Sequence, residues 1–433
     1  MVNMRLMKYL EDKNLLANNQ YGFRAGRSTE DAVLKLSSLI TKYLDSGERC
    51  IGVFLDLQKA FDTVSIPIML ARLRNIGIRG TPLNWFQDYL MNRCQQVRVD
   101  GHFSDHANCL YGLPQGSAVS TSLFLIYINE LCKMELTGAE VIMFADDTAI
   151  VFHGATWEST KRLVENGLRK VTSWLENSLL SINTAKTKYL CFSITNMLSP
   201  AAQFEITIHT YPCNVGDGNE SLQCECAKLE RSATIKYLGV VVDDKLKWSA
   251  HISSLAARIR KAIYMFRILR DMADLKLLIT IYKALCESVI SYCISSWGGA
   301  AKTSLLELER AQRAVIKVIL KLPFKYPTTS VYKKADVLSV RRLYVYQCVK
   351  RYHRITVPTL PVTQKRIDTC PVPRVKTKFA QRYYDVLAPR LYNCINSAQD
   401  IKACSNYSIK NILTHWLKSF DYEGIENLLT IIE

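Results

Sequence analysis

Two adjacent carboxylates, Asp146 and Asp147, lie between two short apolar runs in the segment 141–152. Runs of β-branched and aromatic residues on either side of a short polar stretch predict a strand, a tight turn and a second strand. A third carboxylate, Asp56, ends another apolar run that begins at Cys50. If the strands are antiparallel neighbours, the three carboxylates meet, and such hard oxygen ligands suit Mg²⁺. The alternative is a hairpin with ordinary acidic turn residues, because Asp is common in turns.

The elements around these carboxylates predict an α+β core to about residue 242, followed by a mostly helical module. Apolar residues at helical spacing predict helices over 2–16, 29–44, 120–132 and 156–180, and again from 245 to about 322. Short apolar runs predict strands over 50–56, 189–192 and 235–242. Beyond about residue 330, repeated prolines interrupt the pattern, and few clear elements are predicted.

The positive charge of the chain is concentrated in its C-terminal part. Residues 243–433 hold 32 of the 56 Lys and Arg but only 15 of the 39 Asp and Glu, so the whole net charge of +17 lies there. A region this basic favours a phosphate backbone or an anionic surface as its partner. The alternative is a set of solvated helix faces that keep the protein soluble.

Nothing in the sequence indicates a membrane or secreted protein. No apolar run reaches the ~18 residues of a spanning helix, and the first ten residues lack the apolar core of a signal peptide. An intracellular, reducing setting is therefore expected, without a choice between nucleus and cytoplasm. The one cysteine cluster, Cys213, Cys224 and Cys226 near His209, lacks the paired spacing of most zinc sites, which favours a loop.

The segment Phe54-Leu-Asp-Leu-Gln-Lys-Ala-Phe-Asp62 resembles motif A of the reverse transcriptases of non-LTR retrotransposons. Four further segments resemble motifs B to E in the family's order: Gly112–Ser117, Phe144–Asp147, Trp174–Thr187 and Lys236–Gly239. The loop Gln20–Thr29 is similar to a segment of the fingers of these enzymes. Together the motifs cover roughly residues 1–320, and they most resemble the jockey-like group of LINE-type elements.

The resemblance implies an α+β, right-hand polymerase that acts as an RNA-directed DNA polymerase. Partial fingers are expected over 1–49, a palm with an antiparallel sheet over 50–242, a fingers–palm connection over 82–110 and a helical basic thumb over 243–325. The role of 326–433 is not predicted. The implied reaction adds deoxynucleotides, supplied as deoxynucleoside triphosphates, to the 3′-hydroxyl of a DNA primer on an RNA template. The resemblance also implies two Mg²⁺ ions as cofactors, with Mn²⁺ as a possible substitute.

The resemblance also assigns roles to residues. Asp56, Asp146 and Asp147 would hold the metal ions, and the ring of Phe61 would exclude a ribose 2′-hydroxyl. Nucleotide contacts are implied for Gln115, Gly116, Arg24 and Lys188 (or Lys186), and nucleic-acid contacts for Arg27, Tyr237, Gly239, Arg310, Arg313 and Lys317. Each residue also has a plain structural alternative. For Phe61 it is core packing, for Gln115 and Gly116 an ordinary turn, and for Tyr237 and Gly239 a buried strand. For the lysines and arginines it is an exposed, solvated cation.

Two departures from the family pattern qualify the expected activity. Thr121 stands where motif B usually has proline, a change that a first helical turn should tolerate. The sequence opens inside the helix before the fingers loop, which leaves out the upstream fingers hairpin and any endonuclease, and a 5′-truncated element is expected. One alternative is an inactive remnant that only binds nucleic acid. Another is an RNA-directed RNA polymerase, against which Phe61 argues.

Overall fold

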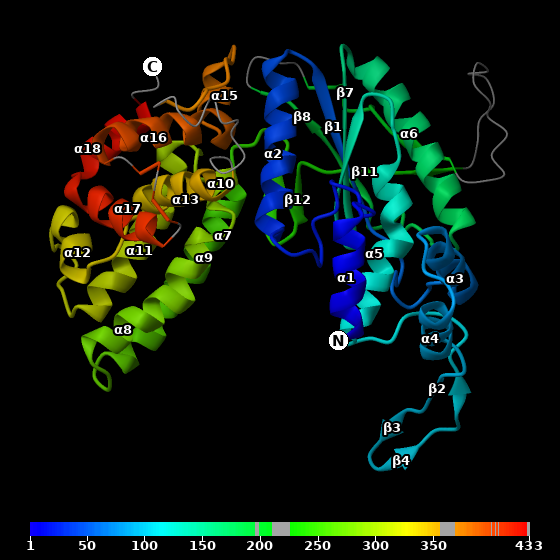
Figure 1. The fold of residues 1–433 in the computed structure, drawn as a ribbon. Coiled ribbons are helices and arrows are strands. Elements are labelled where there is room, and N and C mark those ends of the chain that lie inside the picture. The colour runs from blue at the N-terminus through cyan, green and yellow to red at the C-terminus, as the bar shows by residue number, and fades with distance from the viewer. Residues whose placement is uncertain are drawn as a thin grey trace. The chain divides into compact units, whose positions relative to one another are not determined.

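The structure is a computed structural model that describes residues 1–194, 199–209, 226–355, 369–399, 401, 402, 404, 405 and 407–430 (Figure 1). The chain divides into two compact units. The N-terminal unit contains Met1–Ala32 and Glu48–Ala233, and the C-terminal unit contains Val33–Gly47 and Thr234–Glu433. The longer segment of the second unit therefore begins at Thr234, slightly before the expected end of the palm at 242. The fingers, palm and thumb assignments within these units remain predictions.

A five-stranded sheet organises the N-terminal unit, in the order β11-β8-β1-β7-β6. The central strand β1 (Arg49–Leu55) pairs antiparallel with β7 (Asp147–Gly154) on one side and with β8 (Lys188–Phe192) on the other. Strand β6 (Ala139–Phe144) pairs antiparallel with β7, and β11 (Glu230–Arg231) pairs parallel with β8. Because β1 has no charged residue after Arg49, it can occupy the buried middle of the sheet.

Helices cover one face of this sheet and share a hydrophobic core with it. Helix α5 is buried on nearly every side and packs against β6, while the amphipathic α6 packs against β7 and β1 (Figure 1). Thr156 begins α6 with a capping box, in which its hydroxyl accepts from the Ser159 N–H. The helices of this layer are α1 (Val2–Asp12), α3 (Ile66–Asn75), α4 (Thr81–Leu90), α5 (Ala118–Lys133) and α6 (Trp157–Asn177).

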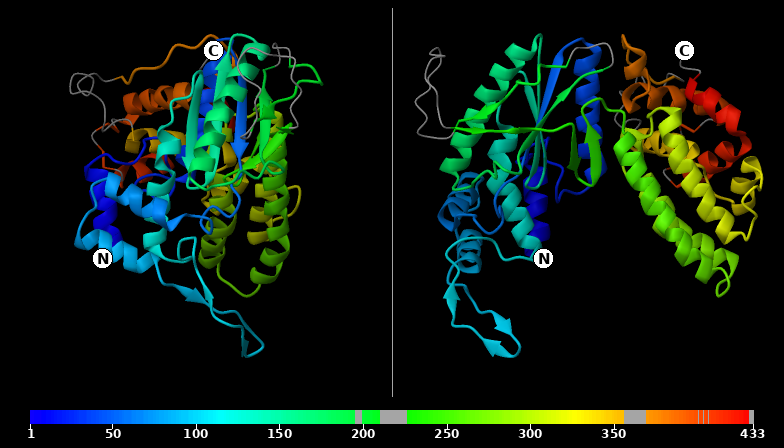
Figure 2. Two further views of the ribbon diagram at one scale, coloured as in Figure 1. Left: turned by 90° about the vertical axis from the view of Figure 1, so that its right-hand side faces the viewer. Right: turned by 180° about the vertical axis from the view of Figure 1, so that it is seen from behind.

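A slender double hairpin projects from α4, away from the sheet (Figures 1 and 2). Its strands are two residues each, and all eight strand residues are exposed. The strands are β2 (Cys94–Gln95), β3 (Arg98–Val99), β4 (His102–Phe103) and β5 (Ala107–Asn108). A second small pair, β9 (Thr207–Ile208) with β10 (Ala227–Lys228), lies beside α6.

The C-terminal unit is a helical assembly that begins with one hairpin, β12 (Thr234–Tyr237) and β13 (Val240–Asp243). Most of α2 (Thr29–Asp45) belongs to this unit. The long helices α7 (Ser249–Leu269) and α11 (Lys302–Ile319) pack along each other. Along the chain, α7 and α11 are connected by α8 (Leu275–Tyr282), a π-helical turn (Lys283–Glu287), α9 (Ser288–Ser291) and α10 (Ile294–Trp297).

Helices also fill the region after residue 326, where the sequence predicted few clear elements. They are α12 (Thr328–Ala335), α13 (Val340–Ile355), α15 (Lys378–Gln381), α16 (Tyr384–Gln399), α17 (Ser408–Ser419) and α18 (Tyr422–Thr430). The predicted α+β class is confirmed. Within the described ranges, no helix has the length and apolar character needed to cross a bilayer. Cys213 and Cys224 of the cysteine cluster lie outside the described residues.

Candidate active site

The three aspartates lie at the ends of neighbouring strands. Asp56 directly follows β1, whose last residue Leu55 pairs with Thr148 of β7. Asp147 is the first residue of β7, and Asp146 occupies the two-residue turn that joins β6 to β7. The predicted strand–turn–strand and the predicted antiparallel neighbours are therefore both present in the sheet.

The carboxylates influence one another electrostatically. Burial raises the pKa of Asp146, and the Asp56 charge raises it further, partly offset by a backbone hydrogen bond. Loss of hydration likewise raises the pKa of Asp147, although its side chain is exposed, and the charges of Asp146 and Asp56 add to this effect. Like charges in one place disfavour ionisation of each, and a bound cation relieves that repulsion.

The motif D segment supports the backbone of Asp56. The Asp56 N–H donates to the Thr187 Oγ1 over 3.2 Å, and the Asp56 carbonyl accepts from the Asn183 N–H over 2.8 Å. Thr187 is fully buried. The sequence reasoning assigned no role to Thr187, although the residue lies inside the segment that resembles motif D.

Two residues predicted to contact the nucleotide lie close to motif A. The ring of Phe61 stacks on Phe124 of α5 at 4.2 Å between centroids, yet Phe61 remains partly exposed. The Gln115 Nε2 donates to the Asp62 Oδ1 over 2.8 Å, which joins motif B to motif A. Gly116, beside Gln115, has φ of +78° and open space where a Cβ would lie. The stacking fits core packing of Phe61, and its sugar contact remains a prediction.

The two loop arginines make contacts within the N-terminal unit. The Arg24 side chain is 7% exposed, and its guanidinium donates twice to Glu11, at 2.8 and 2.6 Å, and once to the Ala17 carbonyl at 2.6 Å. This hydrogen bonding lowers the pKa of Glu11. Arg27 bonds the Asn18 carbonyl and lies over the ring of Tyr21. These contacts give Arg24 a structural role as a buried partner of Glu11, which differs from the solvated cation of the structural alternative, and both proposed ligand contacts remain predictions.

The other predicted residues are distributed between the two units. In the N-terminal unit, Lys188 begins β8 and pairs with Glu230 at 2.7 Å, while Lys186 is exposed in the preceding turn. In the C-terminal unit, Tyr237 is buried and Gly239 turns the β12–β13 hairpin with φ of +82°. Leu238 also has positive φ, and this pattern is typical of a tight type I′ turn.

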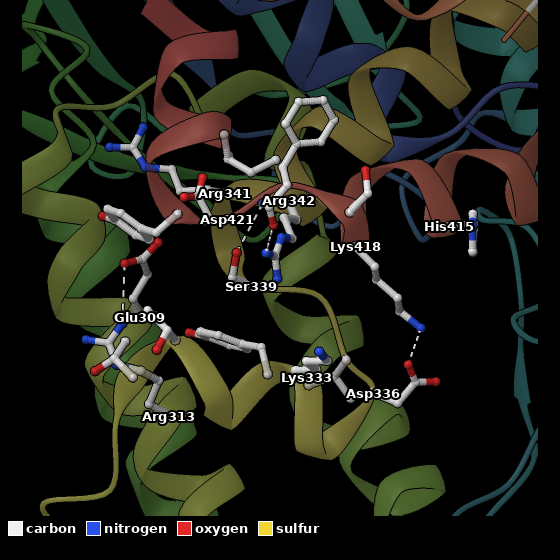
Figure 3. A pocket seen from close by; sticks show the side chains of 18 of the residues that line it. Glu309, Arg313, Lys333, Asp336, Ser339, Arg341, Arg342, His415, Lys418 and Asp421 are labelled. Atoms are coloured by element: carbon white, nitrogen blue, oxygen red, sulfur yellow. Dashed lines mark hydrogen bonds and ion pairs between the residues drawn. The ribbon is translucent and has the colours of Figure 1, made fainter. Parts of the chain in front are cut away.

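The basic residues of α11 are not a uniform exposed face. Arg310 is exposed, but the Lys317 Nζ donates to the Phe324 carbonyl over 2.5 Å. Arg313 reaches Glu309 at 3.5 Å and lines a cavity of about 920 Å³ within the C-terminal unit (Figure 3).

The walls of that cavity come from α11, α12, α13, α17 and α18. Some of its charges are paired: Lys418 bonds Asp336 (Figure 3). The Nε of the lining residue Arg341 lies 3.0 Å from the Oε1 of Glu426. Burial raises the pKa of Glu309. These ion pairs connect the helices that form the cavity wall.

Among the described residues, no three His, Cys, Asp or Glu side chains already stand where they would jointly hold a metal ion. The aspartates nevertheless offer only hard oxygen donors, which is the chemistry that Mg²⁺ and Mn²⁺ prefer. The donor set and its mutual repulsion therefore fit a divalent cation.

Comparison with known proteins adds to this geometry. Residues 1–242 match the family described as "Reverse transcriptase (RNA-dependent DNA polymerase)". The chain is 24% identical over 345 residues to the "Probable RNA-directed DNA polymerase from transposon BS" of Drosophila melanogaster, covering 78% of this chain and 36% of that protein. It is 22% identical over 342 residues to the "RNA-directed DNA polymerase from mobile element jockey" of the same species, covering 77% and 35%.

The chain spans about a third of the length of these curated relatives. Among solved structures, it resembles telomerase from Candida albicans in complex with a telomeric RNA fragment, with a TM-score of 0.41 and 14% identity. That likeness covers 97% of this chain and 58% of the telomerase chain.

Proposed function

Because the chain belongs to the reverse transcriptase (RNA-dependent DNA polymerase) family, we propose that it catalyses template-directed addition of deoxynucleotides to a primer 3′-hydroxyl. The expected kinship with non-LTR, jockey-like retrotransposon enzymes is confirmed by its relatives. An RNA template, a DNA primer and deoxynucleoside triphosphates are the proposed partners, and an intracellular setting remains part of the proposal.

The observation that supports this proposal most directly is the placement of the three aspartates. Asp56 follows β1, Asp146 lies in the β6–β7 turn, and Asp147 begins the adjacent β7. Burial, and then the charge of the neighbouring carboxylates, raises the pKa of Asp146 and of Asp147. A purely structural cluster of acids has no reason to accept this repulsion, whereas a cation-binding site does.

Asp56, Asp146 and Asp147 would hold two divalent ions, either Mg²⁺ or Mn²⁺. Such ions would activate the primer hydroxyl and would stabilise negative charge on the triphosphate and the leaving group. The residues of this chain position the participants: Thr187 fixes the backbone that presents Asp56, and Gln115 holds motif B against motif A.

Selection of deoxynucleotides is proposed for Phe61. Its ring is only partly buried and is held in place by stacking on Phe124. A ring supported from behind resists displacement, so a ribose 2′-hydroxyl placed against it would clash. Primer extension with ribonucleotides separates this proposal from the RNA-directed RNA polymerase.

The test is primer extension with poly-rA template, oligo-dT primer, labelled dTTP and Mg²⁺, run beside Asp146→Asn. We expect extension by the native chain and a loss of about 1,000-fold in the variant, since one of the proposed metal ligands loses its charge. Binding of the template–primer by the variant is the control.

Each outcome is informative. Extension by the native chain alone supports the reverse transcriptase. Equal extension by both proteins contradicts the role of Asp146. If the native chain does not extend the primer but still binds the duplex in a salt-sensitive way, the enzyme hypothesis is refuted. The inactive remnant that only binds nucleic acid is then the supported hypothesis.

A further inference from the structure

A short segment of the N-terminal loop lies along the end of β6, immediately before the catalytic turn. The Tyr21 N–H donates to the Met143 carbonyl over 2.8 Å, and the Met143 N–H donates to the Asn19 carbonyl over 3.0 Å. Gln20 and Met143 form a parallel bridge. The loop therefore adds a single parallel bridge beside β6, at the end of the sheet that carries the aspartates.

Gln20 continues this contact with its side chain. It is 1% exposed, and its Oε1 accepts from the Ala145 N–H at 3.0 Å and from the Gly22 N–H at 2.8 Å. Its Nε2 points back to the Ala145 carbonyl at 3.5 Å, a long contact. One side chain thus engages both polar backbone groups of the residue before Asp146.

Ala145 has a backbone that needs such support. It is buried and has φ of +58°, a region that residues with a Cβ rarely occupy. Positive φ at only the first central residue of a two-residue hairpin turn is the type II′ pattern, and that position usually holds glycine. An alanine there is strained, and strain of this kind persists only where the surroundings hold it.

The loop and the turn also touch backbone to backbone. A Cβ added to Gly22 would lie 2.4 Å from the Ala145 nitrogen and 3.0 Å from the Phe144 carbonyl carbon. Only glycine therefore permits the observed approach, and this contact is independent of the Gln20 side chain.

We propose that Gln20 is a positioning residue that holds the strained Ala145 turn, and with it the Asp146 and Asp147 carboxylates, in the conformation that receives the divalent cations. This inference rests on the proposed polymerase function. Gln20 touches neither substrate nor metal in this scheme, because it acts only through the backbone of Ala145.

The first test requires no catalysis. Gln20→Met keeps the length and volume of the side chain and removes its hydrogen bonds. In hydrogen–deuterium exchange, we expect the peptide covering 141–152 to exchange its turn amide about tenfold faster in this variant, as one lost buried hydrogen bond predicts. Gln87→Met, at an exposed glutamine of α4, is the matched control and should leave that peptide unchanged.

The second test measures cation binding directly. Titration with Mn²⁺, followed by electron paramagnetic resonance, should show affinity about tenfold weaker in Gln20→Met, and primer extension should need a correspondingly higher Mg²⁺ concentration. Gly22→Ala should weaken Mn²⁺ binding in the same direction. In the double variant Gln20→Met with Ala145→Gly, at least half of the lost Mn²⁺ affinity should return on a logarithmic scale, because glycine adopts positive φ without strain.

The outcomes separate the two proposals. A chain that does not extend primers refutes the polymerase function, while exchange and Mn²⁺ binding still decide the role of Gln20. Unchanged exchange in 141–152, or unchanged Mn²⁺ affinity with a lower melting temperature alone, reduces Gln20 to a core residue and overturns the inference. Absence of rescue by Ala145→Gly likewise overturns it.

Discussion

A buried histidine in the C-terminal unit should make that unit sensitive to acid. His251 of α7 is 3% exposed, and its Nδ1 accepts from the Val241 N–H of β13 over 3.3 Å. Its ring lies edge-on to Trp297, 5.4 Å between centroids, and its Nε2 has no hydrogen-bond partner within the described part of the chain. Protonation would therefore remove the Val241 acceptor and place an unpaired cation in the core.

Burial lowers the pKa of His251 from 6.5 to about 4. Between these values the unfolded chain binds the proton and the folded chain does not, so stability is full above pH 6.5 and falls as the pH drops toward 4. The loss is about 2 kcal/mol at pH 5 and levels at about 3 kcal/mol below pH 4.

The comparison is with His251→Asn, whose amide oxygen can replace Nδ1 as the acceptor but does not titrate. The free energy of unfolding of both proteins should be measured in urea from pH 7.5 to 5, with cleavage of the C-terminal unit in pulse proteolysis as the readout. The native protein should lose about 2 kcal/mol more than the variant over this range. Parallel losses would refute the reasoning, because the variant carries every other titrating group.

Two further substitutions test the N-terminal unit. Gly112 has φ of +84°, and an added Cβ would lie 2.8 Å from the Asp62 carbonyl oxygen, so Gly112→Ala should lower the free energy of unfolding by about 2 kcal/mol or more in urea titrations. Unchanged stability would contradict this strain. Arg24→Met should cost about 2 kcal/mol in thermal denaturation, because it removes three charged hydrogen bonds and leaves Glu11 unpaired. An unchanged melting temperature with a raised KM for dTTP would instead support the predicted nucleotide contact of Arg24.

The strands that carry the three aspartates could be predicted because their signals are local. The apolar runs that end at Asp56 and flank Asp146 are short and bounded by polar residues, and both became paired strands of one sheet. Helix α13 was not predicted, since it is buried on many sides and has no clear polar face. Helix α16 was not predicted either, and it contains Pro389, a residue type that usually interrupts a helix.

The supporting residues of the site depend on contacts that the sequence order does not encode. Gln20 meets Ala145 and Thr187 meets Asp56 across more than 120 residues of chain. Local patterns describe neighbours along the chain, so neither pairing has a local signal. For Arg24, charge and loop position suggested a ligand contact, but the partner Glu11 could not be read from spacing alone.

The central place of β1 has a consequence for the order of synthesis. Residues 49–55 pair with 147–154 and 188–192, so β1 emerges from the ribosome long before either partner exists. At ordinary translation rates, this apolar strand waits roughly 5–20 s for β7, and longer for β8. Its unpaired edges are open to wrong partners during that interval. Protection of the nascent β1 edges during that interval would favour the native pairing with β7 and β8.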